Sequence, residues 1–122
     1  MKPEIKAALV AALESGEYKQ GTGFLHEGDC FCLEGVLCDL AVKAGVAQWR
    51  LNYKNVWAIS SVGADFWMYR SVPHDLVLWA GLEDLELQYQ GERRYWYELN
   101  DGRGIVNPLT FPDLAKLIKE QM

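Results

Sequence analysis

The chain has 122 residues, of which 50% are hydrophobic and 12% are aromatic, so an intrinsically disordered chain is excluded and the length fits one ordinary globular domain. The 17 acidic residues outnumber the 12 basic ones and give a formal net charge of −5. This charge disfavours nonspecific nucleic-acid binding, which depends on lysine and arginine contacts with phosphate, and the acidic residues are too scattered for a DNA mimic.

The first predicted element is a helix from Pro3 to Glu14. Proline suits the first turn of a helix, and Gly16 suits its end. The apolar face of this helix consists of Ile5, Leu9 and Leu13. Its polar face lacks the basic residues that bind a membrane surface. The following segment, 17–28, is predicted to be a structured loop, and its GTG sequence lacks the strand and helix context of a phosphate-binding loop.

The second predicted element is a helix from Asp29 to Gly45, DCFCLEGVLCDLAVKAG, at the centre of the fold. Asp29 can cap the first turn, and Gly45 suits the left-handed residue that ends a helix. Apolar residues cover two sides of this helix, as expected for a helix wedged between other elements. All three cysteines lie here, and helical geometry separates Cys30 from Cys38 too far for a disulfide. We therefore expect a reducing cytoplasm as the location.

The segment after this helix is rich in β-branched and aromatic residues, which predicts an antiparallel meander and then a hairpin around QGER. The predicted strands are 48–53, 56–59, 65–70, 85–89 and 94–99. A short helix is predicted over 71–81, and Thr110 with Asp113 three residues later begins the last helix. The whole pattern predicts a single α+β domain, 1–122, with a short antiparallel sheet packed by three main helices. No transmembrane segment or signal peptide is expected.

Four side chains near the start of the central helix belong to the types that bind zinc: His26, Cys30, Cys32 and Cys38. Zinc needs all four ligands at one tetrahedron, but Cys30 and Cys32 would point about 200° apart on a helix. The spacing also lacks the paired knuckles of structural zinc sites. We therefore expect no metal and no other cofactor, and keep this set of four as the alternative.

A small thiol-dependent hydrolase or transferase is a second alternative. Cys30 or Cys32 at the start of the helix would be the nucleophile, because the helix dipole lowers a thiol pKa there. His74 would be the base, oriented by Asp75 or Asn100. A histidine at this position is more often an exposed residue at a helix start, so we do not expect an enzyme.

The aromatic residues exceed what one small core needs to bury. Successive residues of a strand face opposite ways, so the runs 66–67 and 95–97 cannot point entirely inward. Exposed tryptophan and tyrosine beside arginine are typical of protein-binding hot spots, and they also stack on nucleotide bases. A second buried layer or a homodimer seam would account for them equally well. The expected binding residues are Trp67, Tyr69, Arg70, Arg94, Tyr95 and Trp96.

Several short segments occur in an order that is distinctive as a whole. They are LESGEYKQGTGFL at 13–25, CLEGVLCDLAVKAG at 32–45, W-x-G-L at 79–82, L-N-D at 99–101 and F-x-x-L-A-x-L-I at 111–118. Through these segments the chain resembles a family of small uncharacterised proteins of tailed phages and bacterial prophages. Phe31, which separates Cys30 from Cys32, and Pro112 in the last helix depart from that family's pattern.

The resemblance implies a phage accessory protein that acts in the bacterial cytoplasm, and it implies no catalytic residues. Together with the aromatic and arginine residues, it leads to one main hypothesis: a non-enzymatic binding module that engages a host protein. The alternatives are the thiol-dependent enzyme and a nucleotide-binding sponge that uses the same aromatic residues. A homo-oligomer is compatible with all three.

Overall fold

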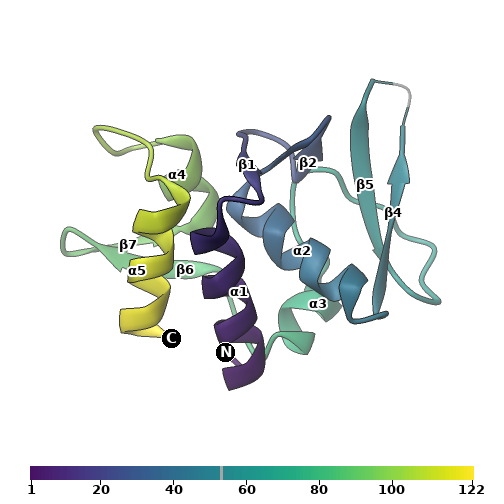
Figure 1. Ribbon diagram of the computed structural model, residues 1–122, viewed down its shortest axis with the longest axis horizontal. Helices are drawn as coiled ribbons and strands as arrows, with labels where there is room; N and C mark the ends of the chain where they lie inside the picture. Colours follow the sequence, from purple (N-terminus) through teal and green to yellow (C-terminus); the bar gives the residue numbers. More distant parts are fainter. Residues whose placement is uncertain (53) are drawn as a thin grey trace.

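The computed structural model describes residues 1–52 and 54–122. Tyr53, the last residue of the first predicted strand, lies outside the described residues. The described residues form five helices, one five-stranded sheet and one two-stranded sheet, which confirms the predicted α+β class (Figure 1). The helices are α1 (Pro3–Ser15), α2 (Leu33–Lys43), α3 (His74–Trp79), α4 (Trp96–Asp101) and α5 (Phe111–Gln121). The strands are β1 (Lys19–Gln20), β2 (His26–Glu27), β3 (Cys30–Phe31), β4 (Ala47–Leu51), β5 (Val56–Ser61), β6 (Glu86–Tyr89) and β7 (Glu92–Tyr95).

The larger sheet has the strand order β1-β3-β2-β5-β4 and is mixed, because β1 and β3 run parallel while the other pairs are antiparallel. The strand predicted over 65–70 is wrong. In that segment only Met68 joins the sheet, through two backbone hydrogen bonds of 2.8 and 3.0 Å with Ile59. Since β2 already pairs with Val56 and Trp57, little of β5 is left for a further strand.

The central position predicted for the second helix is confirmed, because α2 packs against α1, α4 and β4 (Figure 1). The fully buried residues of this helix are Leu33, Val36, Leu37, Cys38 and Ala41. Its predicted start is wrong, since α2 begins at Leu33 with Cys32 as the N-cap. Cys30 and Phe31 instead form β3, because their backbone pairs with both β1 and β2.

The predicted hairpin is confirmed as β6 and β7, joined at Gln90 and Gly91. Both residues have positive φ angles, 52° and 81°, as a two-residue hairpin turn of type I′ requires. The predicted second strand is wrong beyond Tyr95, where the chain enters α4. A hydrogen bond of 2.9 Å from the Tyr95 backbone N–H to the Glu98 carboxylate helps to begin this helix.

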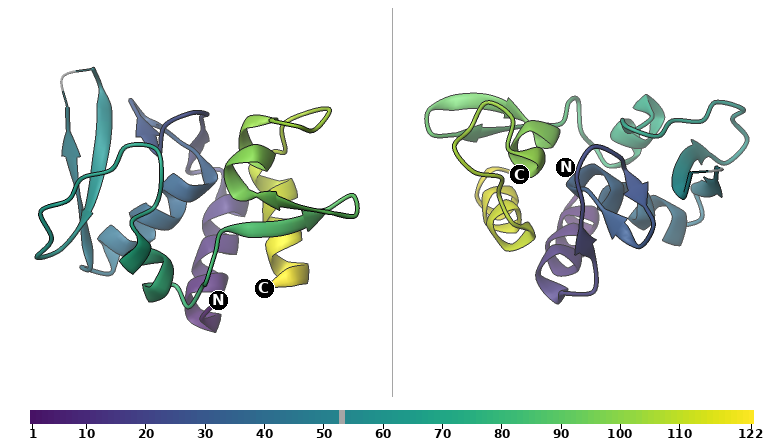
Figure 2. Two further views of the ribbon diagram at one scale, coloured as in Figure 1. Left: turned by 180° about the vertical axis from the view of Figure 1, so that it is seen from behind. Right: turned by 90° about the horizontal axis from the view of Figure 1, so that it is seen from above.

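The first and last helices are confirmed close to their predicted bounds. Gly16 ends α1 in the left-handed conformation with φ 76°, and Thr110 and Asp113 form a capping box at the start of α5. Figure 2 shows the two helices side by side, with the chain ends at the same side of the molecule. A hydrogen-bonded ion pair of 2.8 Å joins Lys119 to Glu14 across them.

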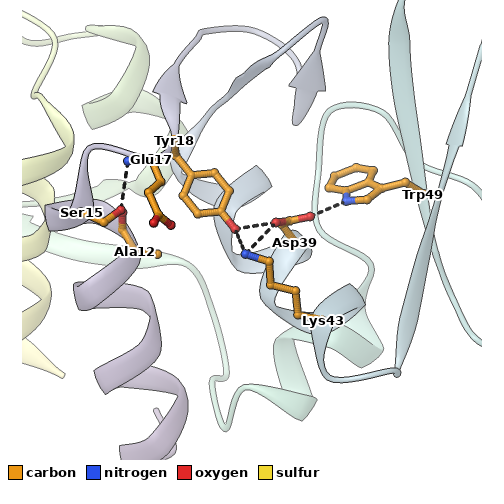
Figure 3. A network of polar contacts seen from close by, with 7 residues as sticks. All are labelled: Ala12, Ser15, Glu17, Tyr18, Asp39, Lys43 and Trp49. Carbon is orange, nitrogen blue, oxygen red and sulfur yellow. Dashed lines mark hydrogen bonds and ion pairs between the residues drawn. The ribbon is translucent and has the colours of Figure 1, made fainter.

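A polar network ties α2 to the loop after α1 and to β4 (Figure 3). Asp39 of α2 accepts hydrogen bonds from the Tyr18 hydroxyl and from the Trp49 indole, the latter at 3.1 Å. Lys43 donates to the Tyr18 hydroxyl at 2.9 Å and lies 3.6 Å from Asp39. The network holds the loop after α1 and strand β4 against the central helix, and its members satisfy one another.

Candidate binding pocket

A pocket of about 470 Å³ opens where the loop after β1, the start of α2, the segment before α3 and both ends of α4 meet. This volume falls within the range of pockets that accept a small molecule or a partner's side chain. The lining residues are Gly23, Glu34, Arg70, Ser71, Val72, Leu85, Tyr95, Tyr97, Asp101 and Arg103. The pocket therefore combines two tyrosines, two arginines and two carboxylic acids.

The two tyrosines form an exposed aromatic wall. Tyr95 ends β7, Tyr97 lies in the first turn of α4, and their rings stack at a centroid distance of 5.6 Å and an angle of 10°. They remain 51% and 43% exposed. Trp96 between them points the other way and is fully buried in the core. The expectation that this run splits between two sides holds, but a binding role for Trp96 is wrong because no part of it reaches the surface.

Two arginines complete the polar side of the pocket. The guanidinium of Arg70 lies 4.6 Å from the centroid of the Phe24 ring, and Arg103 follows the glycine that ends α4. Both side chains belong to exposed residues. The fold thus brings together Arg70 and Tyr95, two of the predicted binding residues, although 24 intervening residues separate them in the chain.

The remaining predicted binding residues lie outside this pocket. The Arg50 guanidinium stacks over Trp67 at 4.1 Å, which accounts for the half-buried state of that indole. Tyr69 is 45% exposed next to Arg70 in the chain. Arg94 is half-buried and pairs with Glu92 at 2.6 Å, so its charge is already matched. These residues were expected on one surface with Arg70, but none of them lines the pocket.

Glu34 is the most unusual residue of the pocket. It lies in the first turn of α2 and is only 6% exposed, yet its carboxyl group has no hydrogen-bond donor among the described residues. Burial, and secondly the negative charge of Asp101, raise the pKa of Glu34 from its ordinary value of 4.5 to about 7. The pocket floor therefore holds a carboxyl group that gains or loses its proton near neutral pH.

This raised pKa predicts a pH dependence of stability. Because the folded state holds the proton of Glu34 more tightly, its contribution to stability is largest below pH 4.5 and is lost as the pH rises through 7. Relative to Glu34→Gln, the wild-type free energy of unfolding is expected to fall by about 3 kcal/mol between about pH 4 and pH 8. Urea unfolding of both proteins across this range measures the difference.

The matched control is Glu83→Gln, which removes an exposed carboxylate outside the pocket. Its stability relative to wild type is expected to stay constant over the same range. A constant difference for Glu34→Gln as well would contradict the burial of an uncompensated carboxyl group at this place.

The cysteines do not form the reactive site of the alternative thiol-dependent enzyme. Cys32 caps α2 by accepting a weak hydrogen bond of 3.4 Å from the Gly35 backbone N–H, and burial raises its thiol pKa to about 12. Cys38 is fully buried, and burial raises its pKa as well. Cys30 lies on β3, so its expected activation by the dipole of a helix first turn is wrong. His74 is exposed at the start of α3, and no hydrogen bond joins it to a cysteine within the described part of the chain.

The four side chains considered as alternative zinc ligands lie in different places and make different contacts. The His26 ring stacks on Phe31 at 3.8 Å and on Trp57 at 5.2 Å, and burial lowers its pKa. Cys38 is fully buried on the core-facing side of α2. Across residues 1–52 and 54–122, no three side chains of metal-binding type come together at one place. The geometry therefore does not assemble the tetrahedron from His26, Cys30, Cys32 and Cys38.

Four charged or aromatic residues of the pocket were missing from the predicted binding residues: Glu34, Tyr97, Asp101 and Arg103. A signal for Glu34 existed, because a carboxylate in a helix that is apolar on two sides is a candidate for burial. The others depend on α4, whose residues were predicted to form a strand and a turn.

The whole chain, residues 1–122, matches the model of a family described as a domain of unknown function, DUF8296. Searches of curated proteins and of solved structures gave no match. None of the helices described here has the length and apolar character needed to cross a membrane.

Proposed function

We propose that this chain, which belongs to the DUF8296 family, is a non-enzymatic binding module that engages a bacterial host protein through the pocket between Arg70 and Tyr97. The observation that carries the proposal is the exposed, stacked pair Tyr95 and Tyr97 with two arginines at the same pocket. Tyrosine and arginine dominate protein-binding hot spots, because they bring a large contact area and directional hydrogen bonds. The resemblance to phage and prophage proteins favours a partner in the bacterial cytoplasm.

A binding module accounts for the pocket better than the thiol-dependent enzyme does. A thiol with a pKa of about 12, as at Cys32, stays protonated at neutral pH and is a poor nucleophile. Cys30 has only a weak contact of 3.7 Å, with Asp29, and lies on a strand away from the helix dipole. Neither cysteine lines the pocket.

The test is an affinity pull-down of the tagged protein from bacterial lysate, read by mass spectrometry. Wild type is expected to recover one protein at near-equal stoichiometry, and Tyr95→Ala with Tyr97→Ala to recover at least about tenfold less. The control is Phe66→Ala, which removes an aromatic ring that is 67% exposed outside the pocket and should leave capture unchanged. No captured protein, or equal capture by the tyrosine variant, would overturn the proposal.

A nucleotide-binding sponge is the second candidate, favoured by the same stacked tyrosines and arginines. A base can stack on the outer tyrosine ring while the phosphates meet Arg70 and Arg103. A nucleotide that binds the folded state raises the melting temperature according to RT ln(1 + [L]/Kd). A melting temperature unchanged by a panel of ribonucleotides would eliminate this candidate.

A further inference from the structure

The floor of the pocket holds a carboxyl group that the protein itself leaves without a hydrogen-bond partner. Glu34 is 6% exposed, and none of the described residues donates a hydrogen bond to it. A buried carboxylate without donors costs several kcal/mol, which a bound group with strong donors removes. Such a residue facing a pocket of about 470 Å³ therefore points to a ligand that carries hydrogen-bond donors.

Asp101 supplies a second carboxylate, held in a fixed orientation. Its Oδ1 accepts a hydrogen bond of 2.8 Å from the Asn100 side chain, and its Oδ2 accepts one of 3.3 Å from the Gly23 backbone N–H. Each oxygen keeps acceptor capacity for a further donor. Asp101 is near enough to Glu34 for its charge to help raise the pKa of that residue. Two neighbouring carboxyl groups favour a cation over a neutral ligand.

The aromatic wall favours a planar cation. Tyr95 and Tyr97 line the pocket as a stacked pair, and both remain substantially exposed. A guanidinium group stacks on such faces and also offers five N–H donors in one plane, which matches two carboxyl groups better than the compact ammonium of lysine does. The pocket chemistry therefore favours arginine over lysine.

The two arginines of the pocket restrict what surrounds that cation. Arg70 and Arg103 repel a partner whose surface is uniformly basic, and they attract carboxylates. Charge complementarity is complete when an inserted arginine side chain is flanked by acidic residues. A polybasic partner would pair with the two carboxyl groups but not with the two arginines, and an isolated anion would pair with the arginines alone.

We infer that the pocket recognises an arginine side chain of the partner protein, whose guanidinium binds between the carboxyl groups of Glu34 and Asp101 and against Tyr95 and Tyr97, with acidic neighbours meeting Arg70 and Arg103. The inference rests on the proposed function, since it names the group that the partner inserts.

Binding of the guanidinium is coupled to loss of a proton. Glu34 is partly protonated at neutral pH, so its O–H bond breaks on binding, the proton passes to solvent and the carboxylate pairs with the cation. The other charged or titratable groups that line the pocket are Asp101 from α4, Arg70 and Arg103 from the adjoining loops, and the two tyrosines. Of these, only Asp101 contributes to the raised pKa of Glu34. On its own helix the neighbouring thiols, Cys32 and Cys38, have raised pKa values and stay neutral.

The experiment titrates the full chain with N-acetyl-L-arginine amide, followed by NMR shifts of the tyrosine rings and by calorimetry. The comparator is N-acetyl-L-citrulline amide, which has nearly the same shape and no charge. Saturable binding of the arginine probe is expected at pH 8, at least about tenfold tighter than that of the citrulline probe. Binding should also be about tenfold weaker at pH 6, because a proton then competes for Glu34.

Glu34→Gln is expected to weaken the arginine probe at least about tenfold and to remove the pH dependence, and Glu83→Gln is expected to change neither. The inference would be overturned if the arginine probe did not saturate, if citrulline amide bound equally well, or if binding did not depend on pH. These three outcomes are measured on the wild-type protein, so they do not depend on whether a variant folds. Partner capture that the tyrosine variant loses but Glu34→Gln retains would overturn the arginine assignment alone. Arginine-probe binding without any captured partner would overturn the proposed function alone.

Discussion

Gly35→Ala is expected to prevent stable folding, lowering the free energy of unfolding by more than about 4 kcal/mol. A Cβ atom at this position would lie 1.8 Å from the carbonyl oxygen of Leu25 and 2.7 Å from its carbonyl carbon. Both are backbone atoms, so no change of rotamer removes the overlap, and either α2 or the chain at Leu25 must move. Both residues are buried, which leaves little room for that movement. Urea unfolding followed by circular dichroism measures the loss.

Whether Gly35→Ala lowers or raises the free energy of unfolding shows whether close packing or helix propensity dominates at this position. In an unobstructed helix, replacing glycine with alanine stabilises by up to about 1 kcal/mol. The double variant Leu25→Ala, Gly35→Ala serves as the control for side-chain crowding, and it should recover nothing because the overlap is with backbone. A Gly35→Ala protein as stable as wild type would contradict the close approach of α2 to Leu25, and with it the position of Glu34 at the pocket.

Elements with strong local signals were predictable from the sequence. Pro3 and Gly16 bound α1, and Thr110 with Asp113 caps α5, because caps and turns depend on residues within a few positions of one another. The hairpin turn at Gln90 and Gly91 belongs to the same class. In these cases the local preference and the tertiary fold agree.

Errors arose where distant partners decide the local structure. Cys30 and Phe31 continue the helical pattern of α2, but pairing with β1 and β2 draws them into the sheet. The run from Tyr95 to Leu99 has strand composition, yet Trp96 becomes fully buried once α4 forms. A local sequence pattern does not show which distant strand the segment will pair with or which part of the core it will pack into.

The sequence predicted the aromatic and arginine residue types of the pocket but not its position or its acidic residues. Exposed tyrosine and arginine residues were anticipated, and Arg70 and Tyr95 do line the pocket. Its acidic floor was not anticipated, because Glu34 and Asp101 meet only after α4 packs on α2. The same packing depends on one asparagine, for which the sequence suggested a turn or the orienting group of a thiol enzyme.

Asn100 is that asparagine, and it is 1% exposed at the junction of three elements. Its Oδ1 accepts hydrogen bonds from the Leu33 backbone N–H at 3.1 Å and from the Gln20 side chain at 3.0 Å. Its Nδ2 donates to the Gly21 carbonyl at 2.9 Å and to the Asp101 carboxylate at 2.8 Å. One amide therefore joins the loop after β1, the start of α2 and the end of α4.

Asn100→Ala is expected to lower the free energy of unfolding by about 2–6 kcal/mol, because the Leu33 N–H and the Gly21 carbonyl lose this partner at about 1–3 kcal/mol each. The Gln20 amide loses one of its two hydrogen bonds and keeps the one to the Leu109 carbonyl. Asn107→Ala, at an exposed asparagine, is the control and should stay within about 0.5 kcal/mol of wild type. Because Asn100 also orients Asp101, the variant should bind the arginine probe more weakly even under conditions where it is folded. Unchanged stability would contradict the junction, whereas lost stability with unchanged probe binding would show that Asp101 holds its place in the pocket without this amide.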